Sequence, residues 1–158
     1  MKISASIYSS KQNDLPALVK DFDDHKIDAF HVDCNDDMHV FEDIKIIRSI
    51  SKTPIDLHII SSEPEKYLPL IEEHAIEYVQ FQYENLKKPL QLPQNSSTRY
   101  GLAIVSDTAV EVFEEYAEQC SFILLMTTTP GQSGGEFRKD NFQKIRKFRN
   151  SFPGKKIH

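Results

Sequence analysis

Short apolar runs alternate with longer amphipathic stretches along almost the whole chain. The short runs are five or six residues long and rich in β-branched and aromatic residues, as expected for buried strands. The longer stretches carry apolar residues at helical spacing, so the alternation is typical of βα units. The expected strands span residues 2–7, 29–33, 55–60, 78–83, 100–104 and 122–126.

The first expected helix follows Asn13 and Asp14, a pair suited to capping a helix start. Pro16 then falls in the first turn, where a helix tolerates proline. The apolar stripe of this helix consists of Leu15, Leu18, Val19 and Phe22.

Two later helices are expected behind capping boxes, in which a hydroxyl and a glutamate three residues on satisfy backbone donors. The pairs are Ser62 with Glu65 and Thr108 with Glu111. The stripes that follow are Tyr67, Leu68, Ile71 and Ala75 in the first case, and Val110, Phe113, Ala117 and Cys120 in the second. Between these helices, residues 84–98 contain two prolines and are expected to form a loop with at most a short turn.

Six strands that are each followed by a crossover predict a parallel sheet in an α/β domain. An open doubly wound sheet normally has a glycine-rich turn after its first strand, but residues 8–15 contain no glycine. A complete barrel of eight units needs at least about 200 residues. We therefore expect residues 1–158 to form a single domain, a (β/α)8 TIM barrel interrupted after about six βα units, with a seventh strand starting near residue 156. Its open edge is expected to favour self-association, so we expect a homo-oligomer.

Composition narrows the class of protein. Charged residues make up 27% of the chain, which excludes wholesale disorder, and the net charge of −5 gives no general attraction to nucleic acid or anionic membranes. The longest apolar run, residues 122–126, is far short of the roughly 20 residues of a membrane span. Cys34 and Cys120 lie far apart, and the first residues lack the apolar run of a signal peptide. We expect a cytoplasmic protein without nucleic-acid or membrane partners.

The charge is unevenly distributed, because residues 136–158 carry eight basic and two acidic side chains. These charges are interleaved with apolar residues at helical spacing, which indicates the solvated face of a helix. The apolar residues are Phe142, Ile145, Phe148 and Phe152.

Two short motifs carry candidate metal chemistry. His31-Val32-Asp33 ends the second expected strand, and Asp56-Leu57-His58 lies in the third. Side chains at positions i and i+2 of a strand share a face, so each pair points in one direction, toward the end of a barrel where active sites form. Two imidazoles and a carboxylate suit a divalent metal ion. The alternative is that each histidine is an ordinary core residue with its hydrogen bonds satisfied.

A glycine-rich segment follows the sixth expected strand. Residues 130–135 read Pro-Gly-Gln-Ser-Gly-Gly and hold three of the five glycines in the chain. Successive backbone amides without side chains between them form anion-binding concavities, and late loops of such barrels often hold phosphate. An ordinary flexible turn is the alternative.

Taken together, these segments resemble the ribulose-phosphate 3-epimerase family. The resemblance rests on residues 2–7, His31-Val32-Asp33 with Asp36 after it, residues 55–58, and Leu124-Leu125-Met126 leading to Pro130-Gly131, in the family's order. It implies a (β/α)8 barrel of the ribulose-phosphate-binding type. It also implies an isomerase that inverts C3 of a ketopentose 5-phosphate, D-ribulose 5-phosphate to D-xylulose 5-phosphate or a close analogue, with a divalent metal such as Zn, Fe, Mn or Co.

The resemblance also implies roles for single residues. His31, Asp33 and His58 would be metal ligands, and Asp33 would also be one of two acid/base carboxylates, acting through an enediolate. Ser6, His58 and Met126 would contact or line the substrate site, and Gly131, Gly134 and Gly135 would lie near the phosphate. In the family the second acid is an aspartate in a Val-Asp-Gly-Gly run at the end of strand seven. Residues 1–158 contain no such run, so we expect this polypeptide alone to be inactive as an epimerase, with no appreciable turnover from one epimer to the other.

Several positions depart from the family pattern. Its Met-Asp-Gly reads Asn35-Asp36-Asp37, a site methionine reads Ile60, and the strand-four histidine reads Gln82. These changes alter the shape and polarity of a substrate pocket. They leave a second hypothesis open, a catalytically silent relative that binds a phosphorylated ligand or serves as an assembly module.

Overall fold

The computed structural model describes residues 2–9, 14–127 and 137–158. In this part of the chain, seven strands form one parallel sheet in sequence order, each hydrogen-bonded to the next. The strands are β1 (Ser4–Ser6), β2 (Ala29–Cys34), β3 (Ile55–Ile59), β4 (Tyr78–Gln82), β5 (Arg99–Ile104), β6 (Phe122–Leu125) and β7 (Lys156–Ile157). The six expected strands are confirmed within a few residues at their ends, and the seventh begins where the sequence predicted.

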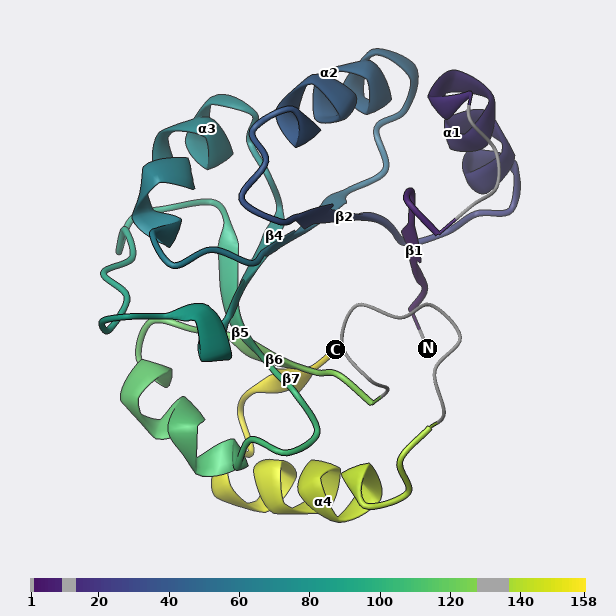
Figure 1. Cartoon of the computed structure of the whole chain (residues 1–158). Coiled ribbons are helices and arrows are strands. Elements are labelled where there is room, and N and C mark those ends of the chain that lie inside the picture. The colour runs from purple at the N-terminus through teal and green to yellow at the C-terminus, as the bar shows by residue number, and fades with distance from the viewer. Residues whose placement is uncertain (1, 10–13, 128–136) are drawn as a thin grey trace.

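The sheet curls, and the helices lie on its outer side (Figure 1). This arrangement confirms a partial (β/α) barrel, since the described helices cover one face of the sheet, whereas an open doubly wound sheet has helices on both faces. The α-helices are α1 (Leu15–Asp24), α2 (Val40–Ile50), α3 (Leu68–Glu73) and α4 (Asn141–Ser151). The 3-10 helices are η1 (Pro64–Tyr67), η2 (Tyr83–Asn85) and η3 (Val110–Tyr116). No described helix is long and apolar enough to cross a membrane.

The start of α1 agrees with the sequence, but both capping boxes are wrong. Asp14 caps α1 and accepts from the Ala17 amide, with Pro16 in the first turn. The Ser62 box fails because Glu63 precedes a proline, which disfavours a helical backbone, and η1 begins only at Pro64.

Thr108 fails as a cap for a different reason. Its hydroxyl donates to Glu84, and Ala109 is extended, so the following turns begin at Val110 and are 3-10 rather than α-helical. The loop predicted for residues 84–98 is confirmed, with a short turn at its start.

The core lies between the outer face of the sheet and the helices. Alternate residues of β2 and β3 point outward into it and are fully buried, among them Phe30, Val32 and Leu57. They pack in one cluster with Ile44 and Ile47 of α2. The residues between them, which include the polar ones, therefore face the interior of the curl.

The close approach of Gly101 to the Phe122 ring inside the curl leads to a prediction about stability. Gly101 on β5 lies in register with Phe122 on β6, and a Cβ at Gly101 would overlap the Phe122 ring. Gly101→Ala should lower the free energy of unfolding by about 1–3 kcal/mol, because a buried, well-packed ring has to move. Urea unfolding measures this change. Gly154→Ala is the matched control, since its Cβ meets nothing within 4 Å. Equal effects of the two substitutions would contradict the prediction.

Candidate metal centre

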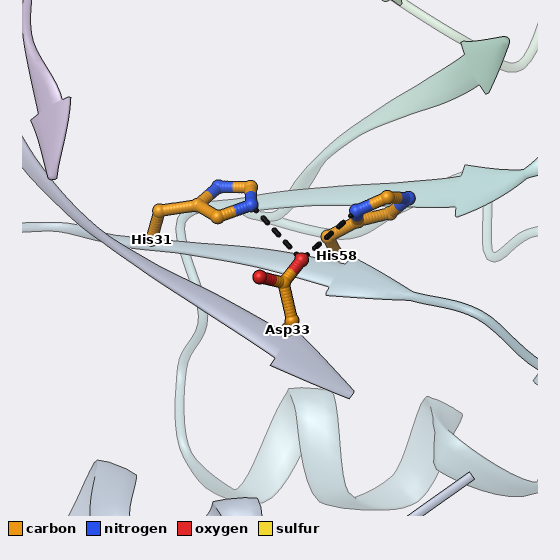
Figure 2. Close-up of side chains that lie close together, drawn as sticks. All are labelled: His31, Asp33 and His58. Atoms are coloured by element: carbon orange, nitrogen blue, oxygen red, sulfur yellow. Dashed lines mark hydrogen bonds and ion pairs between the residues drawn. The ribbon is translucent and has the colours of Figure 1, made fainter. Parts of the chain in front are cut away.

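The structure brings the side chains of His31, Asp33 and His58 together at the carboxyl ends of β2 and β3. Parallel register pairs Asp33 with His58, and the i, i+2 spacing on β2 places His31 on the same face. One ligand atom from each residue lies within 4.8 Å of the others. Figure 2 shows both rings directed at the Asp33 carboxylate.

Asp33 Oδ1 is the centre of the cluster. It lies 3.2 Å from His31 Nε2 and 3.1 Å from His58 Nδ1. The His58 side chain is almost fully buried, whereas that of Asp33 is 33% exposed. The cluster is therefore enclosed at His58, and solvent can reach it at the Asp33 carboxylate.

The outer nitrogen of each imidazole is held by a side chain of the neighbouring strand. Asp56 Oδ2 lies 2.9 Å from His31 Nδ1 and also accepts from the Ser4 hydroxyl at 2.7 Å. Gln82 Oε1 lies 2.7 Å from His58 Nε2. Metal-binding histidines typically have such a partner on the second nitrogen, which fixes the ring and its tautomer.

The donor set passes a test for a divalent cation. With Asp56 and Gln82 accepting hydrogens from the outer nitrogens, the neutral imidazoles of His31 and His58 would each present the lone pair of the inner nitrogen toward Asp33. Two lone pairs and a carboxylate oxygen converge on one place, which suits a cation bound by nitrogen and oxygen.

Charge shapes the titration of the cluster in the metal-free chain. Burial alone would lower the pKa of His31, but hydrogen bonds and charge from Asp33 and Asp56 outweigh burial and raise this pKa to about 9. Burial would raise the pKa of Asp33, and the two histidines instead hold it well below its usual range. At neutral pH, Asp33 is an anion beside a protonated His31.

A pocket of about 330 Å³ opens beside Asp33. Its other walls come from the segment after β1, the loop after β2 and the start of α2, and are mostly polar. They are Tyr8, Asn35, Asp37, His39, Val40 and Asp43. Two of the departures from the family pattern, Asn35 and Asp37, therefore line the space next to the candidate base.

Comparison with known proteins identifies the family. The sequence model of the Ribulose-phosphate 3 epimerase family matches residues 2–158, almost the whole chain. The chain belongs to this family.

Curated relatives carry the name ribulose-phosphate 3-epimerase. The Bacillus subtilis protein is 26% identical over 92% of this chain and 71% of its own length. The proteins of Eremothecium gossypii and Aquifex aeolicus are 34% and 27% identical, over 65% and 75% of this chain and 44% and 58% of their own lengths. The matched part is thus less than two thirds of the latter two relatives.

Two other predicted site residues lie at the ends of β1 and β6. Ser6 ends β1 in register with His31, and Met126 directly follows β6, where its backbone bonds to Ile104 and Ser106. The glycines expected near a phosphate lie outside the described residues. They are Gly131, Gly134 and Gly135.

Sequence reasoning missed the partners of the epimerase-family histidines. Along the sequence Asp56 is a neighbour of His58, but parallel register pairs it with His31 on the adjacent strand. Gln82 departs from the family pattern, yet its amide oxygen lies within hydrogen-bond distance of His58 Nε2. Strand register was the signal available for Asp56, because residues at matching depth on adjacent parallel strands become neighbours.

Proposed function

We propose that residues 1–158 form one domain that supplies the metal site and one acid/base carboxylate of a ribulose-phosphate 3-epimerase. The reaction is inversion at C3 of a ketose phosphate, D-ribulose 5-phosphate to D-xylulose 5-phosphate or a close analogue. The observation that carries the proposal is the His31, Asp33, His58 cluster with both outer nitrogens held. Family membership supports it.

Asp33 is the proposed base. Oδ1 faces the two imidazoles, and the partly exposed carboxylate borders the pocket, where Oδ2 can take the C3 proton. Removal of a proton next to the ketone leaves an enediolate with negative charge on its oxygens. A divalent ion (Zn, Fe, Mn or Co) held by His31, Asp33 and His58 would offset this charge. Asp56 and Gln82 orient His31 and His58 in that site through the outer ring nitrogens.

The substrate is a small phosphorylated sugar in this proposal. Its reacting carbons occupy the pocket beside Asp33, where Asn35 offers hydrogen bonds to hydroxyls. In this proposal Ser6, at the end of β1, and Met126, directly after β6, contact or line the substrate, and the segment with Gly131, Gly134 and Gly135 receives the phosphate. Self-association and a cytoplasmic location remain predictions.

Metal binding should depend on pH through His31. Its pKa is raised to about 9 in the metal-free chain, so below that pH a proton has to leave before the ring can bind a cation. Cobalt affinity should rise about tenfold per pH unit from pH 7 to about 9 and then level off. The pKa of Asp33 is lowered, so this carboxylate adds no proton in that range. Stability linked to the charged His31 is present below pH 6.5 and lost as pH passes 9.

Titration with Co²⁺ in a competing chelator at pH 7.0, 7.75 and 8.5 measures this dependence. Calorimetry in buffers of different ionisation enthalpy should show one proton released per ion at pH 7.5. An affinity that stays constant between pH 7 and 8.5 would contradict the assignment of His31 as a ligand.

Exchange of the C3 hydrogen with solvent deuterium tests the proposed function. Residues 1–158 with Co²⁺ are incubated with each ketopentose 5-phosphate in D₂O, and NMR follows the C3 position. Incorporation that requires both the metal and Asp33 supports the proposal. If neither sugar exchanges, here or in a polypeptide extended by the remaining strands of a relative, the silent binding protein is the better account.

A further inference from the structure

Glu84 connects the candidate metal centre to a neighbouring loop. It lies in η2, two residues beyond Gln82 at the end of β4. Its Oε2 accepts from the Gln82 amide nitrogen, and its Oε1 accepts from the Val105 amide at 3.0 Å and from the Thr108 hydroxyl. Both carboxylate oxygens are thus engaged by donors, on opposite sides.

Because Glu84 accepts hydrogen bonds on both sides, the hydrogen bonds that connect Glu84, Gln82 and His58 can run in one direction only. An ionised carboxylate only accepts, so Gln82 has to present its NH₂ to Glu84 and its oxygen to His58. His58 Nε2 then has to donate, and in a neutral imidazole this leaves Nδ1 without a hydrogen, 3.1 Å from Asp33 Oδ1. His58 Nδ1 is the atom the metal centre needs as a ligand.

We propose that Glu84 is a positioning residue that selects the metal-binding tautomer of His58 by fixing the direction of the Gln82 amide. The function that this inference gives to Glu84 rests on the proposed metal site. The hydrogen placement itself follows from the bonds of Glu84, Gln82 and His58 and can be tested without metal.

Glu84→Gln should reverse the direction of the hydrogen bonds from Glu84 through Gln82 to His58. Val105 and Thr108 still require an acceptor, so the new amide turns its oxygen toward them and its NH₂ toward Gln82. Gln82 then turns its oxygen toward residue 84 and its NH₂ toward His58. Nε2 of His58 has to accept, and Nδ1 carries the hydrogen and donates it to Asp33.

The double variant Gln82→Glu, Glu84→Gln should restore the original direction. A carboxylate at position 82 accepts from the amide at 84 on one side and from His58 Nε2 on the other. The two substitutions keep side-chain size, and the double variant keeps the wild-type net charge. A merely structural role for Glu84 predicts no such restoration.

Long-range ¹H–¹⁵N NMR of metal-free protein with ¹⁵N-histidine reads the hydrogen on His58, whose signals are assigned with His58→Gln. We expect a hydrogen on Nε2 in wild type, whether the ring is neutral or protonated. In Glu84→Gln we expect the neutral Nδ1–H form, and in the double variant Nε2–H again. Glu118→Gln, which removes an exposed charge from the surface after η3, should resemble wild type.

Cobalt affinity is the second readout. Glu84→Gln should weaken it about tenfold or more, in the range of changes around metal ligands, and the double variant should recover part of the loss. An Nδ1–H form in wild type, or an unchanged Nε2–H in a folded Glu84→Gln, would overturn the inference. If wild type binds no cobalt but the hydrogen moves as expected, the metal proposal fails and the role of Glu84 in directing the chain stands.

Discussion

Asp33→Asn is expected to abolish metal binding and C3 hydrogen exchange together. The amide removes the negative charge on which both inner nitrogens converge, and it cannot accept the C3 proton. Loss of a positioned general base typically costs about 10²–10⁴-fold in rate. Changes in residues that only orient ligands already weaken metal binding about 10–100-fold, so loss of a direct ligand charge should exceed this range.

Cobalt titration and deuterium incorporation measure the two effects in the same preparation. Asp24→Asn is the matched control, because Asp24 ends α1 and is exposed. A variant that binds cobalt normally but loses exchange would keep Asp33 as the base and remove it from the ligand set. Normal exchange in Asp33→Asn would refute its role as the base.

Residues 1–158 are expected to exchange the C3 hydrogen of one epimer without interconverting the two. Inversion needs proton removal on one face of the carbon and delivery on the other, and Asp33 serves one face only. Asp56, the carboxylate beside His31, is 6% exposed and accepts from both His31 and Ser4. With Asp33 acting on one face alone, the inverted product should form at least about 10²–10⁴-fold more slowly than with a second acid on the opposite face.

A chimera provides the comparison. The C-terminal segment of the Bacillus subtilis relative that follows its matched region is joined after His158, and cooperative unfolding confirms that the product is folded. Interconversion of the two ketopentose 5-phosphates by the chimera, and not by residues 1–158, is the expected result. Full interconversion by residues 1–158 would overturn the argument for two acids.

The sequence predicted the strands and the convergence of the ligands because both depend on short periodicities. A run such as 55–59 is buried on both faces, and its alternation assigns each residue to one face of the sheet. The i, i+2 spacing of His31 and Asp33 required only that β2 be a strand. Its pairing with β3 then brought His58 to the same place.

The features that could not be predicted from the sequence depend on hydrogen bonds between segments that are distant along the chain. The sequence predicts Thr108 as a helix cap, but its hydroxyl donates a hydrogen bond to Glu84, 24 residues earlier. From the motif alone, Gln82 is a substitution of the family's histidine, because the motif does not show which atoms of the amide face His58 and Glu84. Its role emerges only when His58 and Glu84 are placed on either side of it.

The alternation along β2 and β3 separates two kinds of mutational constraint. Phe30, Val32 and Leu57 pack outward against the helices, while His31 and Asp33 meet their partners inside the curl. Substitutions in one set leave the immediate neighbours of the other set unchanged. The ligand set can therefore drift in evolution, or be redesigned for another cation, while the packing that holds the strands in place is inherited intact.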